Sequence, residues 1–258
     1  MRPHAPRSTT IARAAYRAVF GDLSTFFAAA SPWVFITAFA YLAFDDLFAD
    51  PDWFIRPYAF MALGLSCSVP FLVSWHRRVL TGEPLSPLRM LRFDSRDWRF
   101  FQISLVVVAI GLAPLLALVP IGYLFIVMRW WPAGEVVFAW IPFIILISII
   151  FSSVKFSLAF PMAALDRTRG AIREAFRLSR GQEWTLAISL FLATAPLWIV
   201  RRGLGASIES LWSSPKTYPL SLALYLIALL GGYLSLALAA STASFAYLAI
   251  TQNRDGPA

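Results

Sequence analysis

The sequence contains one cysteine and two histidines in 258 residues, and this scarcity excludes several kinds of site. A single cysteine, Cys67, leaves no partner for a disulfide within the chain, and its apolar neighbours favour a small buried side chain. A metal site needs clustered His, Cys, Asp or Glu, and no second ligand is spaced close to His76. We therefore predict no bound metal and no cofactor.

The sequence also contains little charge. Charged residues make up 14% of the chain and hydrophobic residues 59%, whereas soluble domains average about 25% and about 45–50%. The net charge of +8 would indicate a nucleic-acid partner in a soluble protein. Here the basic residues are divided among the loops between apolar segments, so we predict an integral membrane protein without a nucleic-acid partner. The N-terminal residues lack the features of a cleaved signal peptide, and we expect them to be retained.

Motifs that would indicate an enzyme are missing as well. No GxxxxGK[ST] phosphate loop is present. An intramembrane serine protease needs a serine and a histidine on facing helices, but Ser66 and His76 belong to the same segment and no histidine follows it. The nearest acid to His76 is Glu83, which is a weak basis for acid–base chemistry. We predict that the protein is not an enzyme.

Six segments are long and apolar enough to cross a bilayer, which takes about 20 residues. Their approximate ranges are 23–44, 53–75, 100–128, 136–163, 184–200 and 219–250. We predict an all-α integral membrane protein with one membrane domain, residues 1–258, whose six transmembrane helices form three hairpins. The third segment is long enough to bend, with Pro114 and Pro120 as kink points, and the fifth is the shortest.

Basic residues are concentrated in the N-terminal segment and in the loops after the second and fourth predicted spans. These residues are Arg2, Arg7, Arg13, Arg17, Arg77, Arg78, Arg89, Arg92, Arg96, Arg99, Arg167, Arg169, Arg173, Arg177 and Arg180. The positive-inside rule therefore predicts that both termini lie in the cytoplasm, although the Arg201–Arg202 pair opposes this orientation. Arginine greatly outnumbers lysine, which is usual in proteins encoded by high-GC bacterial genomes. We therefore expect the protein to lie in the bacterial inner membrane.

Two basic segments resemble each other without a gap. "IARAAYRAVFGD" (11–22) aligns with "AIREAFRLSRGQ" (171–182), pairing Arg13 with Arg173 and Arg17 with Arg177. At about 100° per residue the arginines share one side of a helix and the apolar residues the other. We predict amphipathic interfacial helices at 8–21 and 166–181 on the cytoplasmic side, with the apolar side in lipid and Gly21 and Gly181 as left-handed stops. The segment from residue 89 is a weaker third copy of this internal repeat.

The candidate binding residues follow from this arrangement. Arginine forms bidentate bonds with phosphate, so we predict that basic residues at the cytoplasmic side contact lipid head groups or a partner: Arg13, Arg17, His76, Arg77, Arg78, Arg169, Arg173, Arg177 and Arg180. Lys155, with Ser152 and Ser157 beside it, is the one clearly intramembrane ionisable residue. It either reaches to the cytoplasmic phosphates or marks a polar site for an anionic substrate.

One stretch resembles a known family. "PMAALDRTRG" followed by "AIREAFRLSRGQEW" (161–184) is similar to the membrane domain linked to bacterial glycerophosphoryl diester phosphodiesterases, and to related six-span bacterial families. The resemblance is carried by Pro161, Asp166, the Arg180–Gly181 step and Trp184, and "SWHRRVLTGE" (74–83) resembles a short loop in the same group. It implies the membrane architecture only, because no soluble phosphodiesterase barrel is present and its chemistry does not carry over.

The function we predict is that of a non-enzymatic polytopic inner-membrane protein. Its arginine-striped helices would contact anionic lipid head groups, and a second copy of the chain or another membrane protein is the further partner we expect. The alternative is a small transporter or flippase-like permease that uses Lys155.

Overall fold

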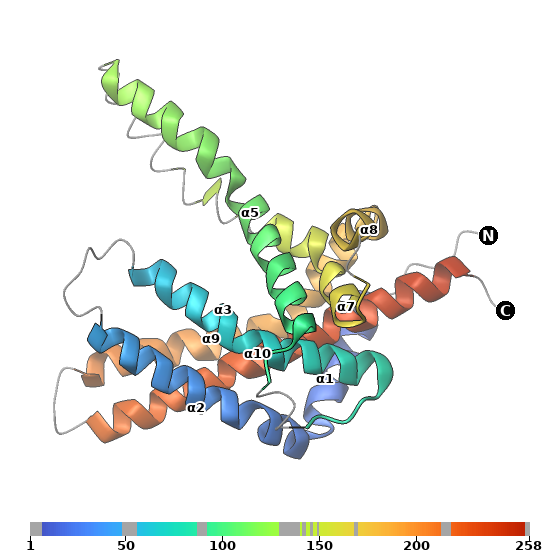
Figure 1. Ribbon diagram of the computed structural model, residues 1–258, viewed down its shortest axis with the longest axis horizontal. Coiled ribbons are helices and arrows are strands. Elements are labelled where there is room, and N and C mark those ends of the chain that lie inside the picture. Colours follow the sequence, from blue (N-terminus) through green and yellow to red (C-terminus); the bar gives the residue numbers. More distant parts are fainter. Residues whose placement is uncertain are drawn as a thin grey trace.

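The computed structural model describes residues 7–47, 56–86, 92–128, 140, 143–144, 147–148, 150–167, 170–212 and 218–255, and within these ranges the regular structure is helical (Figure 1). The principal helices are α1 (Ser8–Phe20), α2 (Leu23–Leu47), α3 (Arg56–Thr81), α5 (Ser95–Val127), α7 (Ala159–Ala164), α8 (Ala171–Ser179), α9 (Glu183–Trp212) and α10 (Tyr218–Asp255). The prediction of an all-helical chain is confirmed for the described residues.

Four helices have the length and apolar composition needed to cross a membrane. The qualifying segments are Leu23–Ala43 in α2, Ser95–Pro114 in α5, Glu183–Gly205 in α9 and Pro219–Gln252 in α10. Large apolar side chains point away from the protein on these helices, including Phe39 at 75% exposure and Phe191 at 68%. Such outward-facing aromatic surface is compatible with lipid and not with water, so the chain is a membrane protein.

The other two predicted spans are not matched by a qualifying segment among the described residues. The second, 53–75, corresponds to α3, a continuous helix that is not among the four qualifying segments. The fourth, 136–163, lies partly outside the described residues, and its described end is broken by a turn at Ser157 and Leu158 before α7. The six spans and the three hairpins therefore stay predictions. The fifth predicted span is longer than expected, because α9 continues to Trp212 and contains Arg201 and Arg202.

Helix α10 lies at the centre of the fold and contacts α1, α2, α3, α7 and α9 (Figure 1). Its C-terminal half is rich in small side chains, and Ala237, Ser241, Thr242 and Ser244 are fully buried. Small residues let neighbouring helices approach closely. Such close packing holds membrane helices together, because lipid is as apolar as the side chains and provides no hydrophobic driving force between helices. By contrast, α5 (green in Figure 1) runs away from the other helices along its second half.

The buried apolar side chains of the two amphipathic helices pack on protein, whereas Phe20 and Phe176 are exposed. On α1, Ala15 and Val19 are fully buried against α9 and α10, and on α8, Ala175 is fully buried beside α7. The apolar side of each helix is narrow and alanine-rich, which suits close packing between helices. The predicted apolar side of each helix therefore contains the residues that are buried in protein, and the position of these helices at a membrane surface stays a prediction.

The ends of these helices differ from the predicted ones. Helix α8 begins at Ala171 and not at 166, because Asp166 (φ 62°) and Gly170 (φ 75°) turn the chain in the left-handed region before it. Gly181 has φ 80°, so the left-handed stop predicted there is confirmed. Gly21 has φ −72°, and the same prediction is wrong for that residue, because the chain continues almost directly into α2.

Candidate functional site

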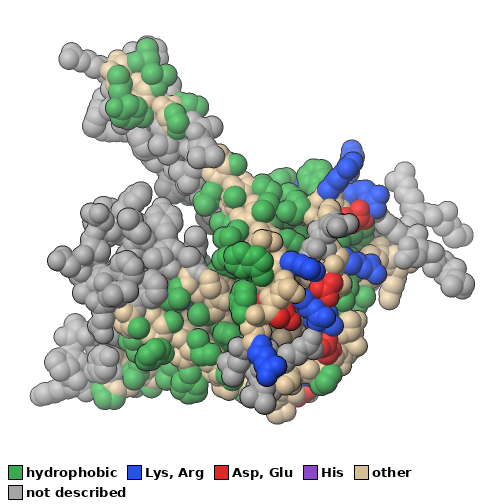
Figure 2. Space-filling model, in the orientation of Figure 1, with side chains coloured by type: hydrophobic (Ala, Val, Ile, Leu, Met, Phe, Trp, Pro, Cys, Tyr) green, Lys and Arg blue, Asp and Glu red, His purple; other side chains and the backbone are tan. Residues whose placement is uncertain are grey.

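Basic side chains gather at one end of the molecule, where the ends of α1, α3, α7, α8 and α10 meet (Figure 2). The face shown in Figure 2 carries acidic side chains among the basic ones in that region, whereas hydrophobic side chains cover the region toward the opposite end. The arginines of this end fall into two groups, which differ in whether an acid lies beside them.

The first group is paired. Asp166 accepts ion pairs from three arginines on two helices: Arg96 at 3.0 Å, Arg99 at 3.7 Å and Arg77 at 3.9 Å. Arg77 also donates to Glu83 at 2.6 Å and to the Ala164 carbonyl at 3.1 Å. These bonds connect α3, α5 and the end of α7. We call Arg77, Arg96, Arg99 and Asp166 the Asp166 cluster.

A second pair joins α3 to the start of α2. Arg78 Nη2 lies 2.5 Å from Asp22 Oδ2. Asp22 also accepts bonds from the hydroxyl and the backbone N–H of Thr25 and from the Ser24 hydroxyl, so it caps α2. These hydrogen bonds, those from Thr25 foremost, hold the pKa of the Asp22 carboxyl well below its usual range. Arg78 is thus engaged by a carboxylate that stays ionised.

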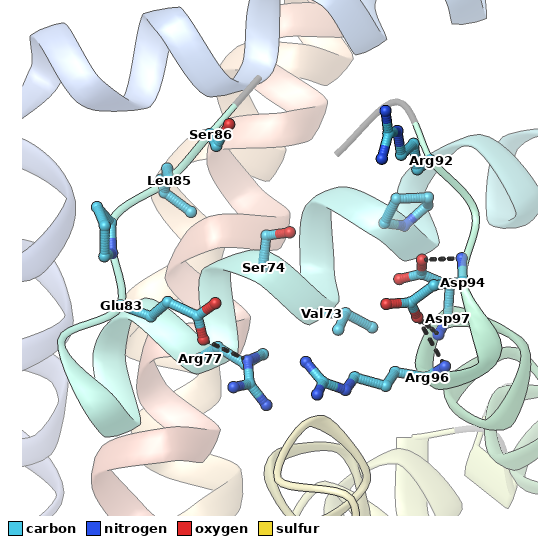
Figure 3. Close-up of a pocket in the computed structure, with 12 residues that line it drawn as sticks. Val73, Ser74, Arg77, Glu83, Leu85, Ser86, Arg92, Asp94, Arg96 and Asp97 are labelled. Carbon is cyan, nitrogen blue, oxygen red and sulfur yellow. Dashed lines mark hydrogen bonds and ion pairs between the residues drawn. The ribbon is translucent and has the colours of Figure 1, made fainter. Parts of the chain in front are cut away.

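A small pocket beside the Asp166 cluster is drawn in Figure 3. It is lined by Arg77, Glu83, Arg92, Asp94, Arg96 and Asp97, among others, and Arg77 and Arg96 point toward each other from α3 and α5. Its volume of about 30 Å³ has room for one or two water molecules. Arg96 Nη1 is buried without a hydrogen-bond partner among the described residues, which a water here would supply. Acids and arginines are equal in number along this lining, so their charges balance, and we assign the pocket a structural role.

His76 is buried inside the protein. Only 2% of its surface is exposed, its Nδ1 lies 2.8 Å from Ser244 Oγ on α10, and the Phe100 ring packs beside it. Burial lowers the pKa of His76 to about 3, so the ring is neutral at ordinary pH. The neighbouring Trp75 Nε1 donates to Ser241 Oγ at 2.9 Å. The predicted head-group contact of His76 stays a prediction, and the structure gives this ring an internal partner.

The second group of arginines is unpaired. Arg13 and Arg17 on α1, and Arg173 on α8 with Arg180 just after it, are exposed, and none forms a side-chain hydrogen bond or ion pair with another described residue. Arg177 on the same face of α8 is bonded to Glu174 at 2.6 Å. Arg169 lies outside the described residues.

Two open grooves accompany these arginines. The α1 groove, of about 550 Å³, is lined by Thr10, Arg13, Ala14, Arg17, Ala18 and Phe245. The α8 groove, of about 860 Å³, lies between α8 and α10, where Arg167 Nη1 donates to the Tyr247 hydroxyl at 3.2 Å. Its charged lining is Arg167, Arg173, Glu174, Arg177 and Arg180. Four arginines against one acid make this groove suited to an anion.

Lys155 has a partner that the sequence does not reveal. Its ammonium group donates to Glu183 at the start of α9, and it lies 4.9 Å from the centre of the Phe176 ring on α8. Lys155 is only 8% exposed. Ser157 Oγ bonds to the Val154 carbonyl, and Ser152 is buried. The charge of Lys155, the centre of the predicted polar site, is therefore neutralised by Glu183. Glu183 lies 28 residues further along the chain, and no local spacing in the sequence indicates this pairing.

Comparisons with known proteins provide no name for this arrangement: no family model, no curated protein and no solved structure matches the chain.

Proposed function

We propose that the protein is a non-enzymatic membrane protein that holds anionic lipid head groups through the unpaired arginines of α1 and α8. The observation that supports this most directly is the contrast between the two groups of arginines. Those of α3 and α5 face Asp22, Glu83 or Asp166, whereas Arg13, Arg17, Arg173 and Arg180 line or flank open grooves without an acid of their own. An exposed guanidinium without a carboxylate is free to bind phosphate bidentately.

We also propose that this end of the molecule faces the cytoplasm of a bacterium, with the protein in the inner membrane. Helix α1 packs against the C-terminal half of α10, where Ile11, Tyr247 and Ile250 share one apolar cluster. The first and last helices therefore place the α1 residues and the C-terminal half of α10 on one side of the molecule. The positive-inside rule assigns the basic side to the cytoplasm.

The internal repeat forms part of the same proposal, in which α1 and α8 are two copies of one phosphate-binding helix. Two pairs of residues matched in the alignment have the same exposure: Ala15 and Ala175 are fully buried, and Arg13 and Arg173 are exposed. The same spacing places each arginine above a buried alanine side and beside α10. Each of the two helices would hold one head group.

The test is replacement of Arg13, Arg17, Arg173 and Arg180 by Gln in one variant. Native mass spectrometry of the detergent-solubilised protein with added phosphatidylglycerol would count the lipids retained. We expect the variant to lose retained lipid, with affinity about tenfold weaker for each head group released, because a charge-assisted hydrogen bond contributes about 1.5–3 kcal/mol.

The matched control replaces the same four arginines by Lys, which keeps the charge and removes the bidentate geometry. Retention between that of the original protein and that of the Gln variant supports direct phosphate contact. Lipid retention that is the same in all three proteins, with unchanged melting temperatures, would contradict the proposal.

A further inference from the structure

The α8 groove carries more positive charge than one lipid phosphate neutralises. Of its charged lining, four residues are arginines and one, Glu174, is an acid, which leaves an excess of three positive charges. A phosphodiester group carries a single negative charge. The α1 groove is lined by two arginines and is the smaller of the two, at about 550 Å³ against about 860 Å³. The α8 groove therefore suits a larger and more highly charged anion.

Three of its arginines form a row along α8. Arg173, Arg177 and Arg180 all line the groove and are exposed, and they follow one another at four and three positions, the spacing of one helix face. At 1.5 Å per residue the row is about 10 Å long. One phosphate at either end of this row leaves the arginine at the other end without a counter-ion. Two phosphates along the row neutralise both ends.

A fourth arginine is held beside α10. Arg167 Nη1 donates to the hydroxyl of Tyr247, which is buried, so this guanidinium is fixed in the groove. A guanidinium has five N–H donors, and the bond to Tyr247 uses one of them. Arg167 therefore adds phosphate-binding capacity from the side of the groove that faces the α8 row.

Apolar side chains complete the lining of the α8 groove. Met162 and Leu178 line it and are buried, and Phe176 lines it with half of its side chain exposed. A lining that combines arginines with apolar side chains suits an amphipathic ligand, which has both a charged head group and acyl chains.

The qualifying membrane segments of two helices end beside this groove. Arg180 precedes Glu183, the first residue of the α9 segment, by three positions, and Thr251 directly precedes Gln252, the last residue of the α10 segment. The ends of membrane spans lie at the level of the lipid head groups. The exposed Trp184 is of the residue type that favours this level. A ligand of the groove is therefore drawn from the membrane.

We propose that the α8 groove binds a lipid with two phosphate groups, diphosphatidylglycerol. This inference rests on the proposed function and specifies the ligand of one of its two helices. The two phosphates, joined by a three-carbon glycerol bridge, lie along the row of Arg173, Arg177 and Arg180. Basic pockets at the cytoplasmic end of membrane helices suit such head groups. Glu174 weakens the site, because its carboxylate lies 2.6 Å from Arg177 and repels phosphate.

The experiment uses the full chain carrying Gln at Arg13 and Arg17, so that lipid bound in the α1 groove does not contribute. Native mass spectrometry would measure retention of diphosphatidylglycerol and of phosphatidylglycerol separately. We expect this parent protein to retain the two-phosphate lipid about tenfold more tightly, because the second phosphate adds charge-assisted hydrogen bonds. Adding Arg173→Gln with Arg180→Gln should remove the preference. Arg202→Gln, the same loss of charge beside Trp198 and outside the groove, should leave it unchanged.

Glu174→Gln tests the same site by a gain of affinity. The change releases Arg177 from its acid and removes the negative charge from the groove. We expect the parent protein with this change to retain diphosphatidylglycerol about threefold more tightly. A purely structural role for Glu174 would not produce such a gain, and unchanged or weaker retention would overturn the proposal.

The outcomes separate this inference from the proposed function. If the parent protein retains both lipids equally, and the Arg173→Gln, Arg180→Gln variant loses both, the proposed function stands and the two-phosphate ligand is wrong. If the preference survives in that variant, it comes from the additional acyl chains, and the inference is overturned. If the parent protein retains neither lipid, the inference and the α8 part of the proposed function both fail.

Two further outcomes are decisive. If inorganic diphosphate displaces the lipid at millimolar concentration, the ligand is a soluble diphosphate and the lipid assignment is wrong. Should the Arg173→Gln, Arg180→Gln variant fail to fold, Glu174→Gln decides alone, with retention equal to that of the parent protein overturning the site.

Discussion

The role open to each arginine side chain in this protein depends on whether the tertiary structure places an acid beside it. Arg77 and Arg173 look alike in sequence, since both stand in basic segments next to an apolar span. In the structure Arg77 contacts Glu83 and the Asp166 carboxylate, whereas Arg173 has no partner among the described residues. The first therefore stabilises the fold, and the second is available to a ligand.

At Asp166 this distinction can be tested by replacing the carboxylate with an amide. Asn tolerates a left-handed backbone almost as well as Asp, so Asp166→Asn keeps the φ of 62° and removes only the charge. We expect a loss of about 1–2 kcal/mol in the free energy of unfolding, because three partly exposed arginines lose their common carboxylate. Thermal unfolding in detergent would measure it. The control is Glu174→Gln, which removes one exposed i,i+3 pair and should cost less than about 0.5 kcal/mol; equal effects would show that the Asp166 cluster adds nothing.

At the scale of elements, an ion pair between a buried lysine and a partly exposed glutamate joins segments that lie far apart in the chain. Lys155 lies near the end of the helical stretch before α7, Glu183 begins α9, and the Phe176 ring of α8 lies beside the Lys155 ammonium. This arrangement places α8 across the junction and explains why a lysine is tolerated at 8% exposure. It also supports a structural role for Lys155 over its use as a transport site.

Removing one member of this pair should cost more than removing both. Glu183→Gln leaves a buried ammonium without its acid, and we expect a loss of about 1–3 kcal/mol in the free energy of unfolding. The double variant Lys155→Met, Glu183→Gln should recover part of that loss, because the remaining side chains are neutral. A double-mutant cycle measured by thermal unfolding tests this. Additive losses would mean that the two residues act independently.

For the whole molecule, the separation of charge from apolar surface supports the proposed orientation. The arginine-rich end contains α1 and the end of α10, and the exposed aromatic surface lies along the qualifying membrane segments. Under the positive-inside rule, the proposal places this basic end on the cytoplasmic side of the bilayer.

This orientation predicts which positions a membrane-impermeant thiol reagent reaches. In a Cys67→Ser background, Thr9→Cys and Gln252→Cys lie at the basic end, whereas Ser207→Cys lies beyond Arg201 on α9. In intact cells we expect labelling of position 207 alone, and after permeabilisation labelling of all three. Labelling of 9 or 252 in intact cells would reverse the proposed orientation.

The sequence alone was sufficient for the helical class, for most helix positions and for the buried sides of α1 and α8. These depend on local properties: apolar length, 3.6-residue periodicity and glycine at Gly181, where only a residue without Cβ fits easily. Tertiary structure decided which charges are paired. The acids that engage Arg78 and Lys155 lie 56 and 28 residues away in the chain. Periodicity along one helix contains no information about what a neighbouring helix places opposite it, and in this protein that opposite side chain decides whether an arginine is paired with an acid.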